Sequence, residues 1–174
     1  MVFAIPAVDS TVFLALFAIA LLACGAPLLV LRRDGLARTL RNVGLAAVLI
    51  VPLTAGLGFT MSDNELRLEQ GKLVLHAAHF YQEERALVEF DLARARAGSL
   101  ASIPETRLGT RSNGISLPGY AAGRFAGGEK GALFALLTDR SRVVYLPAKT
   151  GPSLLISVEQ PAGFLAALRA AQER

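Results

Sequence analysis

The chain has 174 residues, of which 53% are hydrophobic, and its 18 basic and 14 acidic residues give a formal net charge of +4. This length allows one ordinary domain with an appended segment and excludes two large domains. The mean hydropathy of +0.46 exceeds that of soluble globular chains, so part of the sequence is expected to lie outside water.

Two long runs near the N-terminus contain no charged residue, at positions 10–31 and 42–62. Each run is long enough to span a bilayer as a helix. Pro27 and Pro52 lie inside the runs, as prolines commonly do in membrane helices. Neither run has the polar stripe that a soluble helix presents to water, which argues against two buried helices in a soluble bundle. The sequence therefore predicts membrane-spanning helices at about 10–31 and 42–61.

The segment between the runs, 32–41, is predicted to be a basic loop. It contains four arginines and one acid (Arg32, Arg33, Arg38, Arg41 and Asp34). Short basic loops stay in the cytoplasm, so we expect the N-terminus and the C-terminal part outside it. Beyond residue 62, fourteen basic residues are balanced by twelve acidic ones. Because this balance leaves no concentrated basic face, nucleic acid is not an expected partner.

Cys24, in the middle of the first run, is the only cysteine, which excludes an intramolecular disulfide. The residues before it resemble the cleavage box of a bacterial lipoprotein signal, an alternative interpretation of the N-terminus. No basic residue precedes the apolar run, however, and the run continues past the cysteine. We expect Cys24 to be a small buried thiol among helix side chains.

After the second run, the apolar residues change from helical to alternating spacing. Three strands are expected, at 65–69, 72–81 and 85–90, with a tight turn at Gln70-Gly71. The segment 91–100, rich in alanine and arginine, is predicted to form a helical turn.

Three short apolar runs follow, and turn residues separate them. They predict strands at 132–137, 143–146 and 154–157, a spacing typical of a small antiparallel barrel or sandwich. Pro161 suits the first turn of a helix, and the apolar residues after it share one helix face (Phe164, Leu165, Leu168 and Ala171). The expected fold of this part is an all-β unit closed by one C-terminal helix.

The glycine-rich segment 111–125 is predicted to bend the backbone. Gly114 and Gly119 have the spacing of a phosphate-binding P-loop, but Tyr120 and Ala121 stand where lysine and a hydroxyl residue are needed. We expect Asn113-Gly114 and Pro118-Gly119 to be turns, and Gly123 to let the chain re-enter a strand.

Several segments together resemble the bacterial pleckstrin-homology-like (PH) domains of membrane proteins. They are QGKLVL followed by Tyr81, the strand and turn at 87–92, the RxNGxxxPGxxxGxF run at 111–125, VVYLPAKTG, and EQPAGFLAAL. The resemblance covers about 65–171 and implies a seven-stranded, strongly bent barrel capped by the C-terminal helix, often attached to one or two membrane spans. We expect the protein to cross the bacterial inner (cytoplasmic) membrane twice.

The expected fold class is therefore two transmembrane α-helices plus a mainly-β PH-like bent barrel capped by a C-terminal α-helix. The expected domains are a membrane anchor at 1–62 and a bacterial PH-like domain at 63–174. Eukaryotic relatives in fold bind phosphoinositides through a basic loop between their first two strands. The equivalent turn here, 69–72, is too short and too acidic for such a headgroup, so we do not transfer this activity.

Candidate catalytic and metal-binding residues are few. His76 and His79 form an HxxH pair, but a three-residue offset on a strand points the two imidazoles to opposite faces, and no third ligand is evident. The adjacent Glu83 and Glu84 are expected to diverge in a solvated turn. No serine lies in a nucleophile elbow. We therefore expect no enzyme, no metal and no cofactor.

The candidate binding residues are Tyr120 in the glycine-proline loop and a set of arginines (Arg111, Arg124, Arg140 and Arg142, with Arg107 nearby). The expected function is a membrane-tethered binding or assembly module that mediates protein-protein interaction or self-association at the inner membrane. Exposed strand edges or the loop around Tyr120 would provide the contact. Expected partners are the lipid bilayer and either another membrane or envelope protein or a second copy. The alternative function is recognition of anionic lipid headgroups by these arginines. If they bind no anion, the arginines are a solvated rim of the domain.

Overall fold

The computed structural model describes residues 1–103, 108–127 and 131–173. The chain folds as two compact units, which are Ser10–Thr60 on the one hand and Met1–Asp9 with Met61–Arg174 on the other. The first unit is helical and the second is mainly β.

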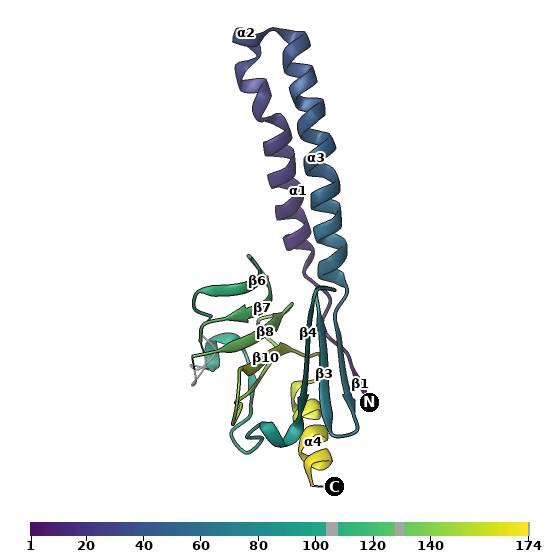
Figure 1. The fold of residues 1–174 in the computed structure, drawn as a ribbon, viewed down its shortest axis with the longest axis vertical. Coiled ribbons are helices and arrows are strands. Elements are labelled where there is room, and N and C mark those ends of the chain that lie inside the picture. The colour runs from purple at the N-terminus through teal and green to yellow at the C-terminus, as the bar shows by residue number, and fades with distance from the viewer. Residues whose placement is uncertain (104–107, 128–130, 174) are drawn as a thin grey trace. The chain divides into compact units, whose positions relative to one another are not determined.

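The helical unit contains two long apolar helices, as predicted (Figure 1). The first consists of α1 (Ser10–Gly25), the 3-10 segment η1 (Ala26–Val30) and the short α2 (Leu31–Asp34), and the second is α3 (Leu36–Ser62). The predicted loop at 32–41 is wrong for most of its length, because only Gly35, at φ +77°, interrupts the helices. Leucine, alanine and arginine are good helix formers, so the charge marks the end of the apolar run without ending the helix.

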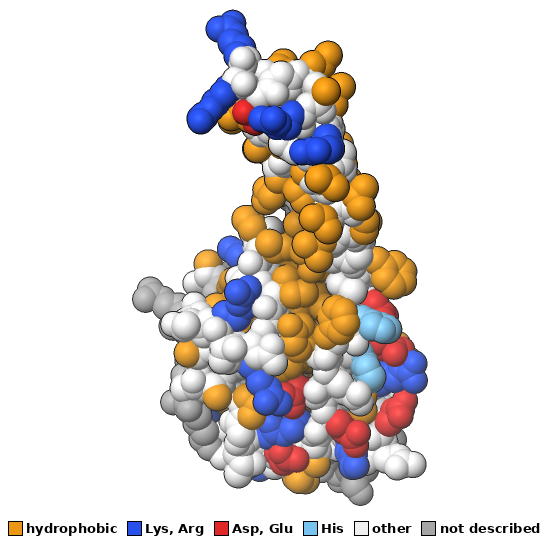
Figure 2. Space-filling view, turned by 45° about the horizontal axis from the view of Figure 1, so that its top comes forward, with side chains coloured by type: hydrophobic (Ala, Val, Ile, Leu, Met, Phe, Trp, Pro, Cys, Tyr) orange, Lys and Arg blue, Asp and Glu red, His pale blue; other side chains and the backbone are white. Residues whose placement is uncertain are grey.

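Both helices are long and apolar enough to cross a membrane, with mean hydropathy 2.6 over Ser10–Asp34 and 2.0 over Leu36–Ser62. Their large side chains are exposed; Leu22, Leu49 and Leu53 each expose more than 70% of their surface. The hydroxyls of Thr39 and Thr54 donate to carbonyls four residues earlier, which satisfies them within the helix. Apolar side chains cover the hairpin, and basic ones gather at its turn (Figure 2). These features support association with a membrane.

The β unit begins with a four-stranded antiparallel sheet in the order β1-β2-β3-β4. Its strands are β1 (Val2–Phe3), β2 (Glu65–Glu69), β3 (Lys72–Ala77) and β4 (Tyr81–Ala86). The sequence did not predict β1, which brings the first residues of the chain against β2. The Met1 ammonium group donates to the Leu68 carbonyl at 2.7 Å. The segment Met1–Asp9 therefore belongs to the β unit.

A turn at 78–80 divides the predicted strand 72–81 into β3 and the start of β4. Ala78 and His79 hold positive φ angles of 51° and 62° there. Non-glycine residues rarely adopt this conformation, and the segment has no glycine, proline or asparagine to signal a turn. The predicted third strand, 85–90, is also wrong beyond Ala86, because Leu87–Glu89 form the 3-10 helix η2.

The second sheet has six strands in the order β5-β9-β10-β8-β7-β6. They are β5 (Arg96–Gly98), β6 (Arg111–Leu117), β7 (Tyr120–Phe125), β8 (Leu133–Leu137), β9 (Val143–Leu146) and β10 (Ser153–Ser157). β10 pairs in parallel with β8, and the other pairs are antiparallel. The predicted helical turn at 91–100 is wrong, because this segment contains β5, and the 3-10 helix η3 (Leu100–Ser102) follows.

The glycine-rich segment forms the hairpin β6-β7, and only one of its two expected turns exists. Pro118-Gly119 is the turn, whereas Asn113 and Gly114 lie inside β6 beside a bulge. Gly114 pairs with Gly123, and a β-carbon on either glycine would collide with the opposite backbone. Glycine therefore permits a close approach of two strands here.

Strands β7 to β10 supply about half of the buried hydrophobic residues of the β unit, and the helix α4 (Pro161–Gln172) adds buried Phe164, Leu165 and Leu168. The Phe3 ring of β1 packs edge-on against Phe164, with ring centroids 4.7 Å apart. The expected class is confirmed: two long apolar helices, a mainly-β PH-like unit and a C-terminal helix. The ladders form two open sheets, and no single closed barrel joins the described strands.

Candidate functional site

The predicted arginines do not form one cluster, because the sheet separates them into two pairs. Arg124 of β7 lies opposite Phe134, near the start of β8, and Arg111 lies opposite Phe125. Arg140 and Arg142 lie in the turn after β8 ends at Leu137. The pairs therefore occupy opposite ends of β8, about 13 Å apart along a five-residue strand. Arg107 lies outside the described residues.

Two of these arginines already have acidic partners. Arg124 reaches across to β4, where its Nη2 lies 2.5 Å from Glu83 Oε1. Arg142 Nε lies 2.7 Å from Asp139 Oδ2. Hydrogen bonding from the Ser141 hydroxyl is the main reason that the pKa of Asp139 is lowered to about 2, and Arg142 adds to it. Glu83 is buried and its neighbour Glu84 binds Lys72, so the two carboxylates diverge as expected, although on a strand rather than in a turn.

Tyr120 was expected at an exposed contact loop, and this expectation is wrong. Its side chain is 1% exposed, because it is the first residue of β7 and faces the interior. Burial raises the pKa of its phenol well above the ordinary value, so the hydroxyl stays protonated. That hydroxyl donates to Asn64 Oδ1 at 3.4 Å. Tyr120 is therefore a structural residue of the β6-β7 turn.

Asn64, which sequence reasoning missed, is the hydrogen-bond centre of this end of the β unit. Its Oδ1 also accepts from the Ala78 backbone N–H at 3.0 Å, and its Nδ2 donates to the Met61 carbonyl at 2.6 Å. One amide side chain thus connects the end of α3, the turn after β3 and the start of β7. An asparagine two residues after the end of a long apolar run was the only available signal.

Replacing Asn64 with leucine should lower the free energy of unfolding by about 2 kcal/mol, because three hydrogen bonds are lost and a buried phenol loses its partner. Tyr120→Phe should cost less than half of that, since it removes only one long bond. Urea unfolding of the full chain in detergent, followed by circular dichroism, measures both. Equal losses in the two variants would show that Asn64 has no connecting role.

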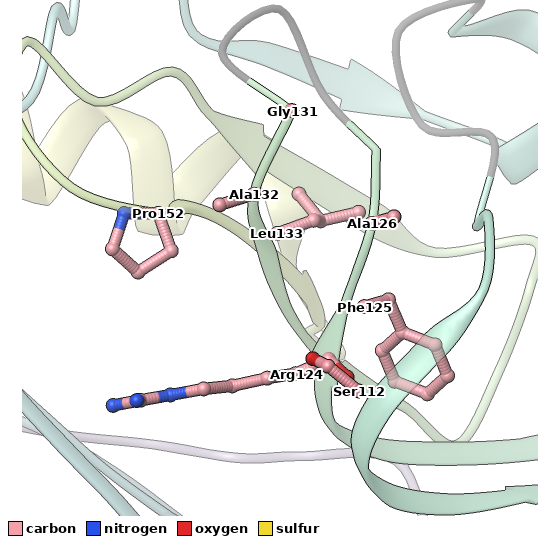
Figure 3. Close-up of a pocket in the computed structure, with 8 residues that line it drawn as sticks. All are labelled: Ser112, Arg124, Phe125, Ala126, Gly131, Ala132, Leu133 and Pro152. Atoms are coloured by element: carbon pink, nitrogen blue, oxygen red, sulfur yellow. The ribbon is translucent and has the colours of Figure 1, made fainter.

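An open depression of about 320 Å³ lies beside the Arg111 end of the β6-β7 hairpin. Its lining is mostly apolar (Ser112, Arg124, Phe125, Ala126, Gly131, Ala132, Leu133 and Pro152). Arg124 and Phe125 point to opposite sides of β7 (Figure 3). Because the Arg124 guanidinium already binds Glu83, the depression offers an apolar floor and no unpaired cation among these lining residues.

The outer edge of β6 is the longest open strand edge of the β unit. β6 ends the six-stranded sheet, and no other described strand pairs with its outer side. Residues 113–117 carry no charged side chain, and Arg111, Ser112, Asn113 and Ser116 are exposed. An edge of this kind presents unpaired backbone N–H and C=O groups to a second strand.

The two histidines differ in their surroundings. His76 lies on β3 opposite Gln82, whereas His79 lies in the turn, with its Nδ1 2.6 Å from Asp63 Oδ2. Within the described residues, no three His, Cys, Asp or Glu side chains are grouped as a metal site would require. Asp63 and His79 supply only two ligands, whereas a zinc site uses three or four ligands from the protein.

Five strands of the second sheet and the helix α4 resemble a known family. Residues 100–172 match the family model described as Bacterial PH domain. This part of the chain is similar to bacterial PH domains. The matched residues include β6 to β10 and α4, and thus the open edge and the residues that line the depression. No curated protein and no solved structure matches the chain. The family indicates a binding or interaction module.

Proposed function

We propose that this protein is a membrane-tethered binding module whose bacterial PH domain engages an extended protein segment along the outer edge of β6. The observation that carries the proposal is the edge itself, which has seven residues and no charge over 113–117. Added strands gain affinity from main-chain hydrogen bonds and specificity from alternate side chains. The apolar depression at the Arg111 end of the same hairpin offers such side chains a contact.

Each of the other sheet edges in the described chain is protected. β1 has two residues and β5 has three, so neither presents a usable ladder. β4 is as long as most strands here, but it carries Glu83, Glu84 and Arg85 in succession. Short strands and charged edges are the usual means by which proteins prevent unwanted strand pairing. β6 lacks both of these protections, although a bulge near Arg111 limits pairing at that end.

The helical hairpin supplies the second part of the proposed mechanism. Two spans would hold the PH domain at the bilayer and raise its effective concentration toward a partner in the same membrane. A second copy of the chain is one such partner, and another envelope protein is the other. Nothing in this mechanism needs a catalytic group, and we propose a non-enzymatic role.

We further propose the inner membrane of a bacterium as the location, with the turn between α1 and α3 in the cytoplasm. The four arginines on the helix ends that flank that turn support this orientation, because basic residues remain on the cytoplasmic side. Both the N-terminus and the PH domain would then lie outside the cytoplasm.

Recognition of anionic headgroups by the arginines has less support. Arg124 and Arg142 each bind an acid, which would have to be displaced or accommodated. Arg111 and Arg140 belong to different ends of the sheet. An anionic headgroup binds best where several donors converge, and these four do not.

Site-specific photo-crosslinking of the full chain in native membranes tests the proposal. Benzoylphenylalanine at Ser116, exposed on β6, should give one discrete protein adduct that mass spectrometry identifies. The same group at Gln82, exposed on the β4 edge, is the matched control and should give none. An adduct of twice the chain mass would identify self-association. Adducts at neither position, or equally at both, would contradict a role for the β6 edge.

A further inference from the structure

The turn between β3 and β4 exposes an aromatic side chain that the proposed binding edge does not use. Outside the helical unit, the described large hydrophobic residues with exposed side chains are Met1, Val2, Phe80 and Val88. Phe80 is the aromatic one and is 70% exposed. A single exposed apolar residue does not by itself mark a contact surface, so the position of Phe80 in the fold has to carry the argument.

The turn is fixed to the residues that directly follow α3. The Ala78 N–H donates to Asn64 Oδ1 at 3.0 Å, and the His79 N–H donates to the Asp63 carbonyl at 3.3 Å. His79 Nδ1 also lies 2.6 Å from Asp63 Oδ2. These contacts hold Ala78 and His79 at their positive φ angles, a conformation that persists only where the surroundings enforce it. Phe80 is therefore presented at a defined place.

That place directly follows the end of α3 in the chain. α3 ends at Ser62 and stays apolar into its last turn, where Phe59 is 74% exposed. With α3 spanning a bilayer and its apolar part ending at Ser62, chain continuity places Asp63 within one or two residue lengths of the hydrocarbon boundary, roughly 4–7 Å. The interfacial layer of a bilayer is roughly 5–8 Å thick on each side. A side chain held beside Asp63 therefore has this layer within its reach.

We propose that Phe80 inserts into the interfacial layer of the bilayer that α3 crosses, so that the turn at 78–80 forms a second, apolar contact between the β unit and the membrane. This inference rests on the proposed membrane span of α3. The contact is with the lipid surface in general, because a phenyl ring gains free energy from leaving water whatever the headgroup charge. It is thus independent of the arginines and insensitive to salt.

The chain contains no tryptophan, so a single substitution gives a unique fluorescent reporter. Phe80→Trp in the full chain, reconstituted into phosphatidylcholine vesicles, should emit at shorter wavelength than tryptophan in water. Bromination of the acyl chains near the headgroup should lower its intensity, and acrylamide in the aqueous phase should have little effect. The matched control is Val88→Trp, because Val88 is 66% exposed at the other end of β4, about 20 Å away. This control should show the opposite pattern.

Flotation with the vesicles separates the possible failures. A chain that floats, with Phe80→Trp emission as red and as unaffected by bromine as the control, would overturn the interfacial contact while leaving the span in place. Emission that is blue-shifted without bromine quenching would assign Phe80 to a protein contact and also overturn it. A chain that does not float would overturn both the span and the contact. Circular dichroism should show that both variants retain the native fold.

Discussion

Gly123→Ala should destabilise the β unit by about 3–5 kcal/mol. Gly123 has φ +118°, which alanine rarely adopts, and its β-carbon would collide with the Asn113 carbonyl and with Gly114. The first effect costs roughly 1–3 kcal/mol and overpacking against a neighbouring backbone costs a similar amount. Since domains are stable by only about 5–15 kcal/mol, a large part of the stability would be lost.

Hydrogen exchange of the full chain in detergent measures this effect, because faster exchange of the β6 and β7 amides would show that the hairpin opens. The matched control is Gly163→Ala in α4, where the new methyl group would meet only the Gln160 side chain, at 3.7 Å or more. Alanine is the better helix former, so this variant should be more stable by about 0.5 kcal/mol. A Gly123→Ala variant as stable as the control would refute the close approach of β6 and β7.

Apolar runs bounded by turn residues predicted the elements whose limits depend only on the nearby sequence. The strands at 133–137, 143–146 and 153–157 and the helix from Pro161 agree with the prediction within a residue or two, because turn residues bound each apolar run. The turn at 78–80 has no such residue and is enforced by Asp63 and Asn64. Contacts between segments far apart in sequence therefore decide what the pattern leaves open.

The candidate site was less predictable for the same reason. Tyr120 follows a Pro-Gly turn, which indicates exposure, yet the pairing of β7 turns its side chain inward. Arg124 and Arg140 are sixteen positions apart, but a strand separates them, and only the register of β8 shows this. The open edge of β6 depends on sheet order, which no local pattern determines. Sequence reasoning pointed to the β6-β7 hairpin as a binding region, but it selected the Tyr120 side chain and missed the open edge of β6.

Arg85, absent from every sequence motif, should be the most sensitive charged residue of the β unit. Its side chain is 11% exposed, and the guanidinium reaches from β4 to the segment before β10. Nη2 donates to the Thr150 carbonyl at 2.5 Å, Nη1 to the Pro152 carbonyl at 3.2 Å, and Nε to Glu89 at 2.5 Å. The group also lies 5.2 Å from the centre of the Phe90 ring. One side chain thus fastens the two sheets together.

Arg85→Leu should lower the free energy of unfolding by about 3 kcal/mol. Hydrogen bonds to a charged group contribute roughly 1.5–3 kcal/mol and the contact with an aromatic ring about 0.5–1 kcal/mol, while leucine recovers some apolar packing. Arg85→Lys should recover only part of the loss, because an ammonium group cannot direct bonds to three acceptors in one plane. Full stability in the Arg85→Lys variant would show that the positive charge alone stabilises the fold and that the geometry of the guanidinium hydrogen bonds does not contribute.

Lys72→Leu is the matched control for Arg85→Leu, because it also removes one positive charge from an ion pair on the same sheet. The Lys72 and Glu84 side chains are 56% and 47% exposed, and water screens such pairs strongly. The urea midpoint of this variant should therefore stay close to that of the parent chain. The two variants differ in burial and in the number of hydrogen-bond acceptors, not in charge. A urea midpoint much lower for Arg85→Leu than for Lys72→Leu would assign the stability to the connection between the two sheets. This connection holds β4 in a fixed position beside the second sheet.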